Sequence, residues 1–236
     1  MYGNIEQGST GLPPSVPFSQ PKNLFRYGEQ TLWSTQLHAG AAGAVALANG
    51  SFRLFTTPLG QVGQGFTNAL TIGETNLKEG GRIPNGIAFD VFGIAAHLGV
   101  SNTTGDSNLG FAVDTAANIQ VLNEILTNGI VSWDFTQTLI DVGPVQLIGA
   151  GGGAFGSVSV DNAAQAAGSS ATVGNMNNGA GSVWLYRKHP VALPGGSTFS
   201  LLLRYGSRMG SIAAAGDSVF VKLVLLGYYK NVIEIG

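Results

Sequence analysis

Three histidines are the side chains of this chain best suited to metal binding or proton transfer. His38, His97 and His189 lie in separate segments, and none has a second histidine four residues away. A metal site or a catalytic triad would therefore need distant segments to meet in the fold. The chain has no cysteine, so it offers no thiolate nucleophile and no sulfur ligand for zinc. We interpret the histidines as ordinary, partly exposed side chains and predict no metal site.

Four acidic residues are candidates for the general acid and base of glycoside hydrolysis, which needs two carboxyl groups facing each other across a cleft. Asp134 and Asp141 fall near the ends of predicted strands, and Glu74 and Glu79 fall in a predicted loop. The sequence does not pair them in space. A carbohydrate-binding or hydrolytic β-sandwich therefore stays open as an alternative, but we predict no catalytic residue and no enzyme activity.

Two further motifs resemble ligand-binding loops without completing the pattern. Gly149–Ala154 fits the G-x-G-x-x-A of dinucleotide-binding folds, but the residues that follow are typical of a strand and not of the helix such a site requires. Asp106 begins a calcium-like loop, but Phe111 and Ala117 stand where an EF-hand needs glycine and glutamate. We interpret both as loops, with an irregular calcium site as the alternative for the second, and predict no cofactor.

A loose concentration of basic residues lies in the last third of the chain. It could face nucleic acid or anionic lipid, since both carry negative charge. Solvated strand faces or salt bridges between subunits are the alternative, which we favour. The residues are Arg187, Lys188, Arg204, Arg208 and Lys222.

Most of these residues fall in or between predicted strands. Alternating or apolar runs bounded by turn residues predict about eight to ten strands, and no β-α-β alternation is present. One helix is predicted over residues 115–126, where Asp114 can cap the first turn. This pattern predicts an all-β antiparallel sandwich, most naturally a jelly roll. The main predicted strands are residues 31–38, 51–57, 87–98, 130–138, 139–148, 183–188, 197–205 and 218–229.

The chain divides into an arm and one domain. Residues 1–22 are rich in Gly, Pro, Ser and Gln, so we predict an extended N-terminal arm, either frayed or lying along a neighbouring subunit. Residues 23–236 form the predicted domain. No secretory signal and no apolar run long enough for a membrane-spanning helix is expected.

The composition points to contacts between copies of the chain. Of the 236 residues only 10% are charged and 44% are apolar, and 36 are glycine. Solitary soluble domains usually carry about 25% charged residues, which keep monomers apart. A large share of the surface is therefore expected to lie in interfaces. The aromatic residues expected to anchor the core or an interface are Trp33, Trp133, Trp184, Tyr228 and Tyr229.

Three stretches combine proline-containing turns with long apolar strands. They are residues 75–91 through Pro84, residues 133–145 through Gly143 and Pro144, and residues 186–227 through Pro190. Together they resemble coat proteins of tailless icosahedral bacteriophages with jelly-roll capsids. Some of those subunits carry two jelly rolls, which need about sixteen strands, whereas this chain has about half that number. The resemblance therefore implies a single jelly roll, with a compact double roll as the alternative.

The resemblance implies a structural virion protein that is synthesised in the host cytoplasm and assembles into the capsid. Its expected partners are further copies of itself as trimers or larger clusters, other virion proteins, and the genome or an internal lipid layer through non-specific contact. No small-molecule substrate is expected. Two alternatives stay open beside it, a virion spike or fibre head that binds a host receptor and the carbohydrate-binding or hydrolytic sandwich.

Overall fold

A computed structural model provides the structure of the chain. It describes residues 23–39, 45–47, 49–101, 122, 124–135, 138–148, 183–186, 189–207, 209, 211–212 and 218–234. The predicted arm, the Gly149–Ala154 motif and the Asp106 loop lie outside these residues. None of the described helices is long and apolar enough to cross a membrane.

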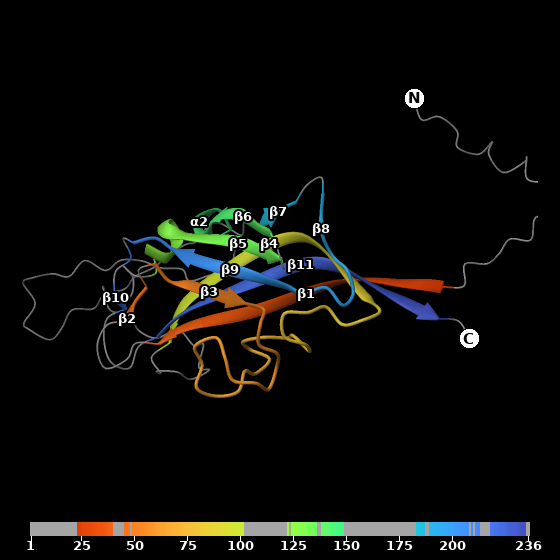
Figure 1. Ribbon diagram of the computed structural model, residues 1–236, viewed down its shortest axis with the longest axis horizontal. Helices are drawn as coiled ribbons and strands as arrows, with labels where there is room; N and C mark the ends of the chain where they lie inside the picture. Colours follow the sequence, from red (N-terminus) through yellow and green to blue (C-terminus); the bar gives the residue numbers. More distant parts are fainter. Residues whose placement is uncertain are drawn as a thin grey trace, which may run out of the picture.

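The described strands form two antiparallel sheets that face each other (Figure 1). The first sheet has the order β1-β11-β4, and the two short strands β7 and β8 both pair with the far side of β4. Its strands are β1 (Asn23–Ala39), β11 (Ser218–Glu234), β4 (Ile87–Ser101), β7 (Trp184–Leu185) and β8 (Val191–Leu193). The second sheet has the order β3-β9-β5-β6. Its strands are β3 (Ser51–Leu54), β9 (Phe199–Tyr205), β5 (Gly129–Phe135) and β6 (Thr138–Pro144). A small separate ladder joins β2 (Val45–Ala46) to β10 (Ser211–Ile212).

The order of the strands is that of a jelly roll. Along the chain the strands pass from the first sheet to the second and back, and the first and last long strands, β1 and β11, pair along their whole length from Asn23↔Glu234 to Ala39↔Ser218. With β7 and β8 sharing one edge, each sheet has four strand positions, the eight expected of one jelly roll. The predicted β-sandwich is therefore confirmed, and the described residues contain one such roll.

The core lies between the inner faces of the two sheets. In β11 every second residue, Val219, Val221, Leu223 and Leu225, is fully buried, which is the alternation expected of a strand with one face in the core. These side chains belong to one large apolar cluster that also contains residues of the opposite sheet such as Leu201. The sheets are therefore held together mainly by burial of apolar surface, at about 25 cal/mol per Å².

Several predicted strands end earlier than expected: the strand predicted to residue 138 ends at Phe135, and the one predicted to residue 188 ends at Leu185. The strand predicted over residues 51–57 stops at Leu54, because Phe55 has a φ of 66° that turns its ring into the core, and the ring is fully buried. The strand predicted over residues 139–148, with a break at Gly143 and Pro144, ends at Pro144, and the turn α2 (Val145–Ile148) replaces its predicted second part. Gly143, with a φ of 145°, lies at that change of direction.

The helix and the two longest strands extend past their predicted ends. Of the helix predicted over residues 115–126, the structure describes residues 122 and 124–126, which are helical, and the helix continues through residues 127 and 128. β11 continues to Glu234 and pairs there with the beginning of β1, so the two strands extend together beyond the second sheet (Figure 1).

The long connection between β3 and β4 covers one end of the outer face of the first sheet. Phe66 and Leu70 from this connection pack on Leu37 and Phe220 of the sheet as a second, smaller apolar cluster. The Gln64 side chain donates to the carbonyl oxygen of Thr35 at 2.6 Å. The connection is therefore docked on the sheet by both apolar packing and hydrogen bonds.

Replacing Gly65 by alanine is expected to release this connection. Gly65 has a φ of 84°, and a Cβ there would lie 2.0 Å from the carbonyl oxygen of Leu37. Gly60 has a φ of 81° but no atom within 4 Å of its Cβ position, so Gly60→Ala is a matched control for the backbone cost alone. We expect Gly65→Ala to lower the free energy of unfolding by at least about 2 kcal/mol more than Gly60→Ala. Urea titration measures the difference, and equal losses in the two variants would contradict it.

Candidate functional site

Trp133 lies in the core and not at a surface. Only 1% of it is exposed, and its ring stacks on Phe135 with centroids 5.5 Å apart and an interplanar angle of 8°. Its Nε1 donates to the Tyr186 hydroxyl at 2.8 Å. Burial raises the pKa of Tyr186, while the bond from Trp133 acts in the opposite direction. Of the two predicted roles, core or interface anchor, the structure gives Trp133 the first.

The other two tryptophans differ from Trp133. Trp33 is half-buried on the outer face of β1, and its Nε1 donates to the carbonyl oxygen of Ile72 at 2.9 Å, so it ties the β3–β4 connection to the sheet. Trp184 forms part of β7, where its backbone pairs with Ile94, and its side chain lies outside the described residues.

The two predicted tyrosine anchors point to opposite faces of β11. Tyr228 is on the outer face, 44% exposed, with its ring 4.9 Å from that of Phe92. Tyr229 is half-buried on the inner face and packs against the edge of the main core. Tyr228 is thus available to a partner, whereas Tyr229 lines the pocket described below.

The large exposed apolar side chains lie on three parts of the described fold. We call them the loop patch, on the β3–β4 connection, the edge patch, on β6 and α2, and the sheet patch, on β7 and the outer face of β11. The loop patch is Leu59, Val62 and Ile72, the edge patch is Leu139, Ile140 and Leu147, and the sheet patch is Leu185 and Tyr228. Exposed apolar side chains mark an interaction site where they form a contiguous surface, so each group is a candidate contact.

The outer face of the second sheet carries a ladder of ion pairs. Arg53 of β3 contacts Asp134 of β5 at 3.0 Å, and the Ser200 hydroxyl donates to the same carboxylate at 3.2 Å. One row further, Arg204 of β9 pairs with Asp141 of β6. Each aspartate is thus engaged by an arginine, and together the four charges cancel.

The second half of this ladder encloses a buried hydroxyl. Ser132 is fully buried although it points to the outer face, because Arg204 and Asp141 cover it. Its hydroxyl donates to Asp141 at 2.6 Å and accepts from Arg204 at 2.9 Å. The Nε of Arg204 is buried without a hydrogen-bond partner among the described residues. Asp134 and Asp141, considered above as candidate acids, therefore lie on a sheet face as partners of arginines.

The structure describes the side chains of two of the five basic residues singled out in the sequence, Arg204 and Lys222. Arg204 is committed to Asp141, so it supplies little free positive charge to an anionic partner. Lys222 is half-buried on the outer face of the first sheet, where burial lowers its pKa and Glu74 acts in the opposite direction. The side chains of Arg187, Lys188 and Arg208 lie outside the described residues.

The histidines are separated in the fold and differ in environment. His38 is buried with its Nε2 3.0 Å from the Tyr205 hydroxyl, and burial lowers its pKa to about 3. His97 lies on the outer face of β4, opposite Lys222; burial and then this neighbour lower its pKa. His189 is exposed. Within the described part of the chain, no three His, Asp or Glu side chains gather as metal ligands would.

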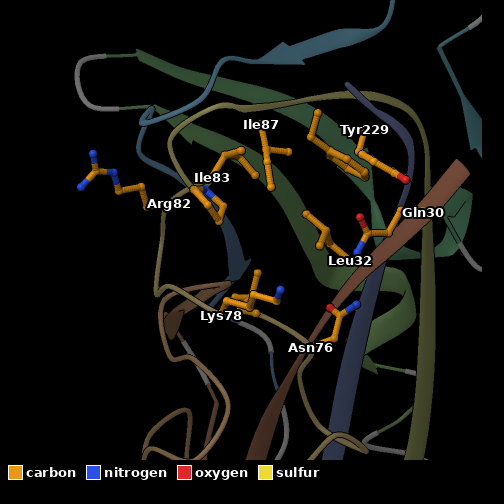
Figure 2. A pocket seen from close by; sticks show the side chains of 11 residues that line it. Gln30, Leu32, Asn76, Lys78, Arg82, Ile83, Ile87 and Tyr229 are labelled. Atoms are coloured by element: carbon orange, nitrogen blue, oxygen red, sulfur yellow. The ribbon is translucent and has the colours of Figure 1, made fainter. Parts of the chain in front are cut away.

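A pocket opens at the end of the sandwich where β1 and β11 extend past the second sheet (Figure 2). Its volume is about 120 Å³. Apolar side chains of β1, β4 and the 76–87 segment line its floor, and polar side chains stand at its rim. The floor residues are Leu32, Leu77, Ile83, Pro84, Ile87 and Phe89, and the remaining lining residues are Gln30, Asn76, Lys78, Arg82 and Tyr229.

Sequence reasoning did not find this pocket, because its walls come from segments about 200 residues apart. Two glycines inside long strands are the signal that could have indicated it, since glycine in a strand often marks a close approach. A Cβ on Gly28 would lie 2.4 Å from the Tyr229 ring, and one on Gly227 would lie 2.5 Å from the Phe89 ring. The Tyr229 and Phe89 rings therefore lie over these two glycines, where they line the opening.

Comparison with known proteins adds no family to this description. No protein-family model matches the chain, and no curated protein matches it.

Proposed function

We propose that the protein is a coat subunit whose copies assemble into a closed icosahedral shell around a viral genome, as in tailless icosahedral bacteriophages. The observation that carries the proposal is the single jelly roll with the strand orders β1-β11-β4 and β3-β9-β5-β6, in a chain with only 10% charged residues. Viral capsid domains are one of the classes that use this fold, and lectins and cupins are others. The fold alone is therefore an analogy, and the surface must discriminate between these classes.

The distribution of exposed apolar residues supports a shell. The β3–β4 connection, which carries the loop patch, and β6 and α2, which carry the edge patch, lie on opposite sides of the sandwich (Figure 1). A simple two-fold dimer buries one patch of each subunit, whereas a closed shell requires every subunit to contact neighbours on several sides. Apolar patches on two sides are what a subunit with several neighbours needs.

The ion-pair ladder is consistent with the same role. Arg53 and Arg204 are each compensated within the subunit, by Asp134 and Asp141. A sheet face with balanced charges can approach sister molecules without the repulsion that an uncompensated face would cause. Closely spaced copies are therefore tolerated on that side.

The proposal is tested by assembly of the full chain and of one charge variant. We expect the purified protein to form trimers, pentamers or shells in light scattering. Val62→Lys, in the loop patch, is expected to raise the concentration needed for assembly by about tenfold or more, because it places a charge in an apolar contact. Gln61→Lys adds the same charge to an exposed polar neighbour and is the matched control, with little expected effect.

Two results would contradict the proposal. One is a wild-type protein that stays monomeric at high concentration. The other is the formation of isolated trimers with no closed particle in negative-stain micrographs, which would favour a spike or fibre head. Equal assembly of the Val62→Lys and Gln61→Lys variants would exclude the loop patch as a contact while leaving the shell to be explained by other surfaces.

A further inference from the structure

The pocket in Figure 2 is an opening into the main core, and this gives it an apolar floor. Leu77, Ile83 and Phe89, which line it, are at most 3% exposed and belong to the core cluster between the sheets. Leu32 and Ile87 are partly buried and pack on that cluster. An apolar group entering the pocket would thus contact the core itself, and water there finds few hydrogen-bonding partners.

The size of the pocket limits the apolar group to a small one. Its volume of about 120 Å³ is somewhat below that of the roughly 150 Å³ apolar cavity that takes up benzene in another protein. One phenyl ring or a branched aliphatic group of similar size fills such a space. A long acyl chain or a sugar ring with its hydroxyl groups does not match this size and floor.

The rim has a sign. The lining contains two cations, Lys78 and Arg82, and no carboxylate. Arg82 donates to the Asn85 side chain at 3.1 Å and lies 3.9 Å from Glu79, and Figure 2 shows its guanidinium turned away from the cavity. Lys78 is exposed, has no ion-pair partner among the described residues, and turns its ammonium toward the cavity.

Two amide side chains stand on the β1 side of the same rim. The Asn76 side chain already hydrogen-bonds to β1: its Nδ2 donates to the Thr31 carbonyl oxygen at 2.8 Å, and its Oδ1 accepts from the Trp33 backbone amide at 2.9 Å. Gln30 is exposed, and its side-chain amide points toward the cavity. Lys78 and Gln30 therefore leave an ammonium and an amide donor available at the mouth.

We propose that this pocket binds a small carboxylic acid, as its anion, with an apolar body of about six carbon atoms. The apolar body lies on the floor formed by Leu32, Ile83 and Ile87, and the carboxylate accepts hydrogen bonds from the Lys78 ammonium and the Gln30 amide at the rim. Charge-assisted hydrogen bonds of this kind fix the orientation of the ligand. The proposal does not rest on the proposed coat function.

A charge series on one ring tests the ligand class with the full chain. Equilibrium dialysis compares benzoate, benzyl alcohol and benzylammonium, which share the ring and differ in charge. We expect benzoate to bind about three- to tenfold more tightly than benzyl alcohol, and benzylammonium to bind most weakly. Lys78→Gln should remove the preference for benzoate without changing the affinity for benzyl alcohol.

Arg82→Gln is the matched control, because Arg82 also lines the pocket but points away from it. We expect it to leave the order of the three affinities unchanged. A second variant, Ile87→Phe, fills the cavity and should abolish binding of both benzoate and benzyl alcohol. Its fold is checked by circular dichroism, and if it does not fold, ring-to-methyl contacts from Leu32 and Ile87 in NMR spectra of the wild type replace it.

The proposal is overturned if benzoate does not bind, if benzyl alcohol and benzoate bind equally, or if Lys78→Gln and Arg82→Gln have the same effect. None of these outcomes bears on whether the protein forms shells. Conversely, a monomeric protein that binds benzoate through Lys78 would contradict the coat proposal and support the pocket.

Discussion

Trp133→Ala lowers the free energy of unfolding by about 3–5 kcal/mol, the range observed when a large buried aromatic side chain is truncated. Trp133 is 1% exposed, stacks on Phe135 and contacts the ring of Phe199 at a centroid distance of 6.3 Å, so its removal leaves a cavity between several rings. It also removes the donor that bonds the Tyr186 hydroxyl. Chemical unfolding followed by circular dichroism measures the loss.

Two other substitutions separate the contributions to this loss. Trp133→Phe keeps an aromatic ring but removes the indole donor and part of the volume, so we expect a smaller loss than for alanine. Tyr228→Ala removes a ring that is 44% exposed and should cost less than about 1 kcal/mol in the subunit itself. If Trp133→Ala and Tyr228→Ala destabilise the subunit equally, Trp133 is not part of the core.

The second large effect is a loss of stability in acid that depends on His38. Its pKa is 6.5 in an unfolded chain and about 3 in the folded protein, because the buried imidazole cannot be hydrated as a cation. Below pH 6.5 the unfolded state therefore binds a proton that the folded state does not. Stability falls as the pH decreases from about 6.5 toward 3 and has no contribution from His38 at higher pH.

The size of this effect follows from the difference between the two pKa values. At 1.36 kcal/mol per unit, the change from 6.5 to about 3 gives an upper bound of about 5 kcal/mol. The measurement is the free energy of unfolding of wild type and His38→Gln at several pH values. Glutamine stays uncharged and can still bond the Tyr205 hydroxyl, so we expect the variant to be less sensitive to acid by several kcal/mol.

Two controls separate His38 from other titrating groups. His189→Gln, at an exposed position, should leave the pH dependence of stability unchanged. His97 has a lowered pKa through burial and Lys222, so it contributes in the same direction, and His97→Gln measures its share. Parallel pH curves for wild type and His38→Gln would contradict the assignment.

The outer faces of the two sheets have different characters, which bears on how copies could pack. The second sheet presents the balanced ladder of Arg53, Asp134, Arg204 and Asp141. The first sheet is covered at one end by the β3–β4 connection and presents the sheet patch elsewhere. Under the coat proposal, the apolar contacts between copies would form at the loop patch, the edge patch and the sheet patch. The ion-pair ladder, which has no net charge, would face a surface that is also without net charge.

Much of the fold was predictable from local pattern. Residues 199–205 and 218–229 alternate or are continuously apolar because one or both sides of their strands are buried, and turn residues bound most of the strands. Pro144 ends β6 as its missing amide hydrogen leads one to expect, although the four residues after it form a turn of helix and not the predicted strand. The alternation of Phe89, Asp90 and Val91 is of the same kind, since Phe89 and Val91 are buried and Asp90 between them is half-buried.

The β-sandwich class, the approximate strands and the scarcity of charge can all be read from the chain without its fold, because each depends on composition or on residues one or two positions apart. Four features need the folded chain: Phe55 turns inward, Trp133 bonds Tyr186, Arg204 is neutralised by Asp141, and Lys78 and Gln30 stand over one apolar pocket. These features arise where strands far apart in the chain become neighbours. Hydrophobic periodicity reports which face of a strand is buried, but it carries no information on which other strand covers that face.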